Sequence, residues 1–311
     1  QAMLLSGTEM ASKADRKKFG LITKFRTIPG CIGIYNILGN KHSVAEIEEI
    51  ILGSNTLSTD EYLECRVMNL IVETFYNNAM FEEIYPMLRA LGVSPMSCLI
   101  YIQEHSELYT IRIKEIFASF VAETMEDLFS TWEEANEYVL NEDVINKYIG
   151  GELGTNELLF HRVLLFNEFD DMCNLMFDSV IGTLKQKNLL TKAIEDYLLD
   201  LKRFIFMRKK DFLTKTEETT KATFKHDFEA IGAAQYYVDP NSLSIFNNPI
   251  ELDFFHNQKQ QELISNQVKL YSAHAIGMGK MLQRTNMKLL FRHFGRLTAN
   301  SKSTHEIRKH S

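Results

Sequence analysis

The chain has 311 residues, of which 45% are apolar and 24% charged, and its formal net charge is −7 at pH 7. This composition is typical of a globular protein with an extensive core, and the acidic balance argues against broad electrostatic binding to nucleic acid. No apolar run reaches roughly 18 residues or follows a basic N-terminus, so neither a membrane span nor a signal peptide is predicted.

The first part of the chain is predicted to alternate short strands with turns and one helix. A helix over residues 11–19 ends at Gly20, which suits a left-handed C-cap. Pro29-Gly30 and Gly39-Asn40 are typical turn pairs. Strands are expected at residues 2–5, 21–28, 31–37 and 45–52. Strand, helix and strand in this order form a βα unit of the kind found in α/β barrels and open sheets.

Two or three strands cannot bury an apolar face without a partner. This first part is therefore expected to need a sheet that lies outside this sequence. The chain also begins with Gln1 rather than an initiator methionine, directly before a predicted strand. Such a start is typical of a fragment or of a processed product.

A long apolar segment follows the strands. Residues 63–76 are apolar on more than one face, which is typical of a helix buried among neighbours. Ser58 and Glu61 are three residues apart and form a capping box at its start. We expect this helix to join the first part of the chain to the remainder.

The remainder is predicted to be mostly helical. Helices are expected at residues 81–91, 94–105, 108–140 (one helix or two), 142–149, 156–185 and 189–207. Residues 219–237 favour strands and are expected to pair with residues 250–255, with a turn at Asp239-Pro240-Asn241 between them. Helical segments follow at residues 257–273 and 275–294.

The predicted fold class is mainly α, with an incomplete edge of an α/β barrel. The expected domains are the barrel edge with two or three strands (residues 1–55), an irregular helical domain (56–210), a small β-hairpin with helices (211–294) and a polar, basic, disordered tail (295–311).

The first 80 or so residues resemble the C-terminal part of cobalamin-binding radical SAM proteins. The matching segments are residues 3–10 (MLLSGTEM), 24–29 (KFRTIP), 44–50 (VAEIEEI) and 57–62 (LSTDEY), followed by Cys65-Arg66 and Phe75-Tyr76. In that family a late barrel strand ends in a Gly-Thr turn, an Arg-containing strand and an acidic strand follow, and a Leu-Ser-x-x-Glu-Tyr helix leads into a variable helical region. Residues 277–282 and 289–292 are similar to the closing segment of the family.

The chain departs from that family in its metal motifs. The family's [4Fe–4S] cluster is held by the three thiolates of a CxxxCxxC motif, and its open iron binds S-adenosylmethionine. Neither this motif nor the Asp-x-His-x-x-Gly motif of the cobalamin domain is present. The resemblance therefore implies that S-adenosylmethionine, the cluster and cobalamin belong to an upstream barrel and cobalamin domain of the parent chain.

The cysteines support no metal site of their own. Cys31, Cys65, Cys98 and Cys173 are widely separated, and no two of them form a CxxC pair. A large core has little need of disulfides, so we interpret them as buried thiols in a reducing compartment, the cytoplasm.

By the resemblance, Gly7, Thr8 and Arg26 are the candidate cofactor-binding residues. The Gly7-Thr8 turn follows a strand end, where α/β folds place ligand loops, and Arg26 suits a carboxylate or phosphate. The alternatives are a tight turn with a Thr helix cap and an ordinary arginine on a solvated strand edge. No catalytic residue and no metal ligand is assigned.

Three other groups have both a functional and a structural interpretation. Glu46, Glu48 and Glu49 form either a carboxylate site or a solvated strand face, and Arg66 is expected to anchor its helix to one of them. Glu157 and His161 lie one helical turn apart, but Glu-x-x-His spacing is absent, so a partly buried histidine is favoured. Arg208-Lys209-Lys210 is interpreted as a helix C-terminus rather than a binding patch.

Two functions are therefore expected, from different classes. The first is the C-terminal portion of a radical SAM enzyme, completing the barrel and covering the site of a small-molecule or peptide substrate, with catalysis in the missing upstream part. The second is a non-catalytic helical protein-interaction module. A reading frame that continues upstream into CxxxCxxC favours the first, whereas an initiator methionine close to Gln1 favours the second.

Overall fold

The structure is a computed structural model that describes residues 2–126, 128–150, 152–154, 156–271 and 275–296. It is mainly helical, with two small antiparallel sheets. Its contacts divide the chain into two units, Gln1–Leu70 with Lys114–Arg162 and Ile71–Ile113 with Val163–Ser311. The boundaries expected at residues 55, 210 and 294 do not coincide with this division. Most of the predicted disordered tail, from residue 297 onwards, lies outside the described residues.

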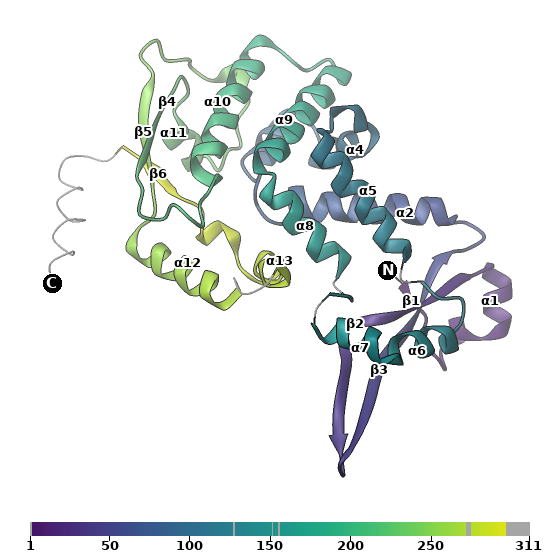
Figure 1. Ribbon diagram of the computed structural model, residues 1–311. Coiled ribbons are helices and arrows are strands. Elements are labelled where there is room, and N and C mark those ends of the chain that lie inside the picture. The colour runs from purple at the N-terminus through teal and green to yellow at the C-terminus, as the bar shows by residue number, and fades with distance from the viewer. Residues whose placement is uncertain (1, 127, 151, 155, 272–274, 297–311) are drawn as a thin grey trace. The chain divides into compact units, whose positions relative to one another are not determined.

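The sheet of unit 1 has three strands, β1 (Ala2–Met3), β2 (Ile22–Ile37) and β3 (Asn40–Gly53), in the order β1-β3-β2 (Figure 1). Both β1 and β2 are antiparallel to β3. The predicted strand–helix–strand unit therefore forms with β1 and β2 parallel to each other, and β3 lies between them in the sheet. Helix α1 (Lys13–Phe19) makes the crossover and ends at Gly20 with φ 58°, the predicted left-handed cap.

One long strand replaces two of the predicted strands. The turn expected at Pro29-Gly30 is an irregularity inside β2, where the register with β3 shifts between Thr27 and Ile32. Because proline lacks a backbone N–H, it is tolerated in an edge strand at such a bulge. The chain reverses instead at Leu38 and Gly39, whose φ angles of 52° and 85° suit a tight hairpin.

Helix α2 (Thr59–Ile71) begins with the predicted capping box. The Ser58 amide donates to Glu61 Oε2 at 2.7 Å, and the Glu61 amide donates to Ser58 Oγ at 3.2 Å. A π-helical turn (Val72–Tyr76) continues it. Only part of this segment is buried, because Leu70 and Phe75 are fully enclosed whereas Cys65 is exposed. The expectation that this helix is buried on nearly all sides was therefore wrong for its first half.

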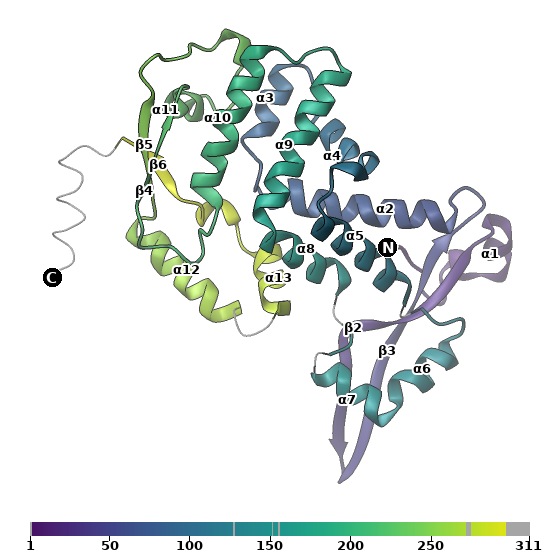
Figure 2. The same cartoon turned by 45° about the horizontal axis from the view of Figure 1, so that its top comes forward.

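The core of unit 1 lies where the sheet meets its helices. Ile50, Leu52 and Tyr62 are buried and pack with Met125 and Leu128. The helices of this unit are α1, α2, most of α5 (Ile111–Glu126), α6 (Trp132–Leu140), α7 (Glu142–Gly150) and the first part of α8 (Glu157–Asn167). Helices α6 and α7 lie along β2 and β3 (Figure 2).

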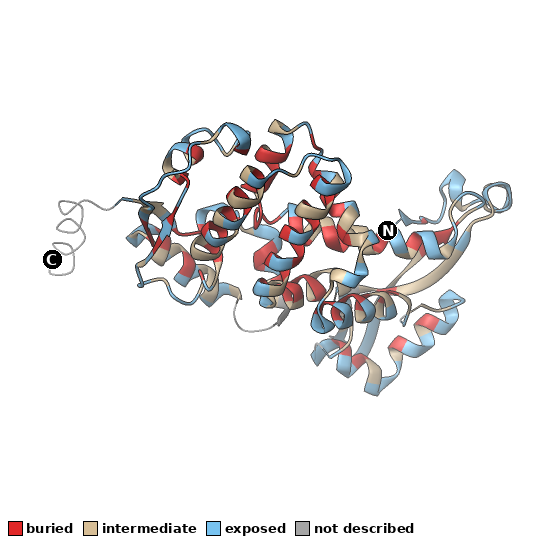
Figure 3. Cartoon of the chain, turned by 90° about the horizontal axis from the view of Figure 1, so that it is seen from above, coloured by how far each residue is buried: buried red, intermediate tan, exposed pale blue. Residues whose placement is uncertain are grey.

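Unit 2 is built from helices whose buried faces form its core (Figure 3). They are α3 (Ile84–Ala90), α4 (Pro95–Glu104), α9 (Phe169–Gln186), α10 (Lys192–Lys209), α11 (Phe228–Ala233), α12 (Gln258–Tyr271) and α13 (Ala275–Arg284). The helix expected at residues 156–185 is divided at Glu168 into α8 and α9. Within the described residues, no helix is long and apolar enough to span a membrane.

The sheet of unit 2 confirms the predicted pairing only for residues 220–224, because residues 228–233 form helix α11 rather than a strand, and it adds a third strand. Strand β4 (Thr220–Phe224) pairs with β5 (Ile250–Phe255), and β6 (His293–Gly295) pairs with the other edge of β5. The last predicted helix, over residues 275–294, is therefore wrong beyond Arg284. Phe204 of α10 lies at the centre of the aromatic core, against Phe224, Phe228, Phe254 and Phe294.

Candidate functional site

Gly7 and Thr8 form a tight turn on the surface of unit 1. Gly7 has a φ of 85° and no atom within 4 Å of where a Cβ would stand, and Thr8 Oγ1 donates to the Leu5 carbonyl at 2.7 Å. Thr8 also precedes a short 3₁₀ helix (Glu9–Ala11). The turn therefore has an exposed backbone, while the Thr8 hydroxyl is engaged within the turn.

Arg26 lies in a chain of ion pairs rather than on a solvated edge. Its Nε donates to Glu48 Oε1 at 2.7 Å, and its Nη1 lies 3.5 Å from Glu157 Oε1. The same Glu157 oxygen accepts from Arg66 Nη2 at 2.8 Å. Arg66 thus anchors α2 to the start of α8, and not to a strand glutamate as expected.

The strand glutamates do not form a carboxylate site. Glu49 accepts from Arg16 Nη1 and Nη2 at 2.6 Å each and from Thr23 Oγ1 at 2.6 Å. The bonds from Arg16 are the main reason why the pKa of Glu49 is lowered. Glu48 is paired with Arg26, and Glu46 is exposed. Glu48 and Glu49 are therefore neutralised by separate arginines.

His161 is a buried histidine with its polar atoms engaged. Its Nδ1 lies 2.7 Å from the Glu157 carbonyl oxygen, and its Nε2 lies 2.9 Å from Ser119 Oγ. The rings of Phe120 and Phe160 contact it edge-on. Among the residues that the structure describes, no three His, Cys, Asp or Glu side chains are grouped so as to hold a metal ion.

The expectation that the cysteines are buried was correct for two of them and wrong for the other two. All four are free thiols, but only Cys98 and Cys173 are buried, whereas Cys31 and Cys65 are exposed. Burial raises the pKa of Cys98 to about 11 and that of Cys173 to about 12. Such thiols stay protonated and unreactive at neutral pH.

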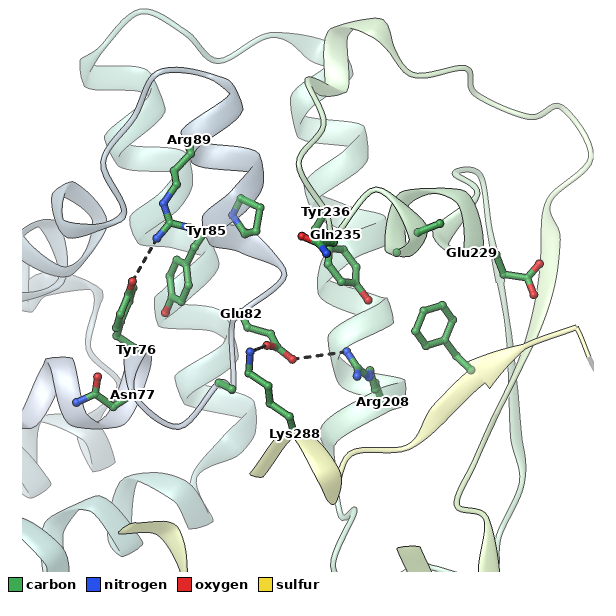
Figure 4. A pocket seen from close by; sticks show the side chains of 15 residues that line it. Tyr76, Asn77, Glu82, Tyr85, Arg89, Arg208, Glu229, Gln235, Tyr236 and Lys288 are labelled. Atoms are coloured by element: carbon green, nitrogen blue, oxygen red, sulfur yellow. Dashed lines mark hydrogen bonds and ion pairs between the residues drawn. The ribbon is translucent and has the colours of Figure 1, made fainter. Parts of the chain in front are cut away.

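Unit 2 contains a pocket of about 1030 Å³ with an aromatic and charged lining (Figure 4). The π-helical turn, the loop after it and α3 supply one wall, and α10, α11 and the C-terminal segment supply the other. The polar or aromatic side chains that line it are Tyr76, Asn77, Glu82, Tyr85, Arg89, Arg208, Glu229, Gln235, Tyr236, Lys288 and Phe294.

Glu82 holds two cations at the edge of this pocket. Its Oε2 lies 2.5 Å from Lys288 Nζ, and its Oε1 lies 4.0 Å from Arg208 Nη1. The guanidinium of Arg89 donates to the Tyr76 hydroxyl at 3.2 Å, on the wall formed by α3. Positive side chains therefore enter the pocket from three separate elements.

A fully buried ion pair fixes the wall behind Glu82. Lys209 and Glu83 have side chains that are 0% exposed, and Lys209 Nζ lies 2.7 Å from Glu83 Oε2. The same ammonium donates to the carbonyls of Ala79 and Met80 at 2.7 and 3.0 Å. All three of its donors are thereby satisfied. Burial lowers the pKa of Lys209, and the charge of Glu83 opposes that shift.

Arg208 connects this buried pair to the pocket. Its Nη1 donates to Glu83 Oε1 at 2.7 Å and its Nε to the Arg292 carbonyl at 3.2 Å. The guanidinium lies over the rings of Phe291 and Phe294, with 6.0 and 5.7 Å to the ring centres. These contacts hold the guanidinium in one orientation.

Tyr236 enters the pocket from a strained backbone. Gln235 and Tyr236 have φ angles of 53° and 59°, a region that residues other than glycine rarely occupy. Within the described part of the chain, the Tyr236 hydroxyl has no hydrogen-bond partner. Burial, followed by the charge of Glu83, raises the pKa of this phenol, so it stays a neutral donor.

This pocket was not predicted from the sequence. Residues 208–210 were predicted to form a helix C-terminus, which is confirmed because α10 ends at Lys209. However, Lys209 meets Glu83 across 126 positions of the chain, and no local pattern encodes such a contact. Adjacent charges at Glu82-Glu83, in the first turn of the helix predicted at residues 81–91, were the one available signal.

No family model matches the sequence, and no curated protein is detectably similar to it.

Proposed function

We propose that the chain is the C-terminal part of a cobalamin-dependent radical SAM enzyme. In this proposal the sheet of unit 1 extends the α/β barrel of the parent protein, and the helical part of the chain covers the substrate, a small molecule or a peptide. The cluster, S-adenosylmethionine and cobalamin are held by the barrel and cobalamin domain of the parent, where the chemistry takes place.

The observation that carries the proposal is the open edge of the sheet in unit 1. Strand β1 pairs only with β3 among the described strands. On β1 and just after it, Met3 and Leu5 are 50% and 57% exposed. A single exposed apolar residue is ordinary, but two at the free edge of a strand are typical of a docking edge. A barrel strand placed against β1 would pair its free backbone groups and cover these side chains.

The order of the elements supports the proposal as well. The Gly7-Thr8 turn follows β1, the Arg26 strand pairs with the acidic strand β3, and the Leu-Ser-x-x-Glu-Tyr segment begins α2. This is the order that the resemblance implies.

The residues of this chain do not fit the iron–sulfur cluster. The sequence lacks the three-thiolate motif, and the described residues contain no cluster of metal ligands. In this proposal, no step of the radical reaction is therefore assigned to residues of this chain. A cofactor carboxylate at Arg26 would also have to compete with Glu48 and Glu157, which already bind its guanidinium.

Hydrogen exchange tests whether the sheet edge is covered in the parent protein. In the isolated chain, we expect the amides of residues 2–5 to exchange rapidly, while those of α2 stay protected. In the parent polypeptide, the amides of residues 2–5 should exchange much more slowly. Equal exchange of these amides in both forms would contradict the proposal.

The second candidate function is a non-catalytic interaction module, which the same exposed apolar edge favours. In that case a separate protein covers β1, and the polypeptide that contains this chain carries neither iron nor cobalamin. Metal analysis of that polypeptide therefore separates the two candidates.

A further inference from the structure

We propose that the pocket of unit 2 binds a phosphate monoester that carries a flat ring, the class to which nucleoside monophosphates belong. This inference concerns unit 2 alone and does not rest on the function proposed above. It is supported by the charge balance of the pocket, by two donors without acceptors and by its aromatic lining.

The charge balance favours a dianion. Arg89, Arg208 and Lys288 line the pocket, and so do the carboxylates of Glu82 and Glu229. Glu229 is already bound by Arg296, whose Nε lies 3.0 Å from Glu229 Oε2. The buried Glu83 is compensated by Lys209. Only Glu82 therefore opposes three cations, and a phosphate monoester carries about −1.5 to −2 charges at pH 7.

Two hydrogen-bond donors in the pocket have no acceptor. Within the described residues, the Tyr236 hydroxyl and Arg208 Nη2 make no hydrogen bond. Figure 4 shows the side chains of Tyr236, Arg208 and Lys288 directed toward one region beside Glu82. A phosphate group at this point would accept from all three, and charge-assisted bonds of this kind are the strong ones.

These donors are preorganised. The guanidinium of Arg208 is fixed by Glu83 and by the rings of Phe291 and Phe294. The left-handed backbone at Gln235 and Tyr236 directs the phenol into the pocket. A strained backbone conformation that persists is often associated with a binding or catalytic site. Because the donors are already ordered, binding costs little side-chain entropy.

The size and lining of the pocket call for more than inorganic phosphate. Its volume of about 1030 Å³ is that of a site for an organic molecule. The rings of Tyr76 and Tyr85 lie with centres 4.8 Å apart on one wall, and Phe294 lies on the other. Aromatic side chains that line the same pocket as the cations suit a flat ring that is joined to the phosphate by a short spacer.

Isothermal titration calorimetry of the full chain tests the inference with three probes. We expect adenosine 5′-monophosphate to bind at least about tenfold more tightly than adenosine or inorganic phosphate alone, because only the ester engages both the cations and the rings. The affinity should fall as salt concentration rises. Equal affinity for the ester and adenosine, or no binding of the ester at millimolar concentration, would overturn the inference.

Matched variants then locate the site. Lys288→Gln should weaken binding of the ester about threefold to fivefold, and Tyr236→Phe about threefold to tenfold. The controls are Lys259→Gln, an exposed lysine of α12 outside the pocket, and Tyr237→Phe, the exposed neighbour of Tyr236. Both controls should bind as the unmodified chain does. Equal effects in variants and controls would overturn the assignment to this pocket.

Glu82→Gln gives a test of opposite sign. It removes the carboxylate that pairs with Lys288 and lies 4.0 Å from Arg208 Nη1. Binding of the ester should therefore tighten severalfold, whereas a ligand held through an ammonium group would bind more weakly. Weaker binding of the ester in this variant, with an unchanged thermal transition, would contradict a phosphate site beside Glu82.

Discussion

Lys209 shows how a single residue determines the wall of the pocket in unit 2. Its ammonium joins Glu83 to the carbonyls of Ala79 and Met80 with no exposed surface. Ala79 itself has a φ of 56°, so the loop that carries Glu82 is held in a conformation that the chain would not adopt alone. The buried pair therefore positions Glu82 as well as closing the core.

Replacing Lys209 with methionine should destabilise the protein by about 3–5 kcal/mol, because Glu83 Oε2 stays buried without its cation and only Arg208 still pairs with this carboxylate. Urea-induced unfolding measures this change. Lys192→Met, an exposed position on the same helix, is the matched control and should be almost neutral. Adding Glu83→Gln to Lys209→Met should recover part of the loss. Similar stabilities of the two single variants would contradict a charged, buried pair.

His256 should make stability depend on pH. Burial lowers its pKa to about 4 from the ordinary value of 6.5, while its Nε2 donates to the Leu290 carbonyl at 2.9 Å. The folded state thus binds a proton less readily than the unfolded state. This contribution to stability is complete above pH 6.5 and is lost as the pH falls toward 4.

The test is the pH dependence of the unfolding free energy for the unmodified chain and for His256→Gln, whose amide nitrogen can reach the same carbonyl. The variant should lose less stability than the unmodified chain between pH 6.5 and pH 4. Parallel curves for the two proteins would show that His256 takes up its proton equally well in the folded state.

At the scale of elements, helix boundaries were more predictable from sequence than strand pairing. The capping box at Ser58, the Gly20 cap and the start of α4 at Pro95 depend on neighbours within four residues, and all three are confirmed. The β2 strand through Pro29-Gly30 depends instead on β3, which supplies the pairing that bridges the bulge. At Pro29-Gly30 the pairing of β2 with β3 therefore determines the structure, although the two residues by themselves favour a turn.

The capping box predicts a local effect. Ser58→Ala should cost about 1 kcal/mol of unfolding free energy, because the Glu61 amide loses its acceptor at the first turn of α2. Urea-induced unfolding checks the loss, and Ser244→Ala in an exposed loop is the control. The amides of residues 59–62 should also exchange faster in the variant. Unchanged stability and unchanged exchange would show that α2 needs no cap.

At the scale of the whole molecule, the sequence predicted a mainly helical chain but not its division. Secondary structure suggested a boundary after the strands, near residue 55. In the structure, residues 114–162 join the first 70 residues, because Phe129 pairs with Phe25 and Glu157 binds Arg26 and Arg66. These contacts link positions about a hundred residues apart, and no motif of the sequence marks them. For the same reason, the pocket of unit 2 could not be found from sequence.

The measurement that most directly tests the proposed function is the iron content of the natural polypeptide that contains this chain. The polypeptide is purified without oxygen, reduced and supplied with S-adenosylmethionine. We expect about four iron atoms per polypeptide and the release of 5′-deoxyadenosine after reduction. A polypeptide that folds, carries no iron and leaves S-adenosylmethionine intact would contradict the account.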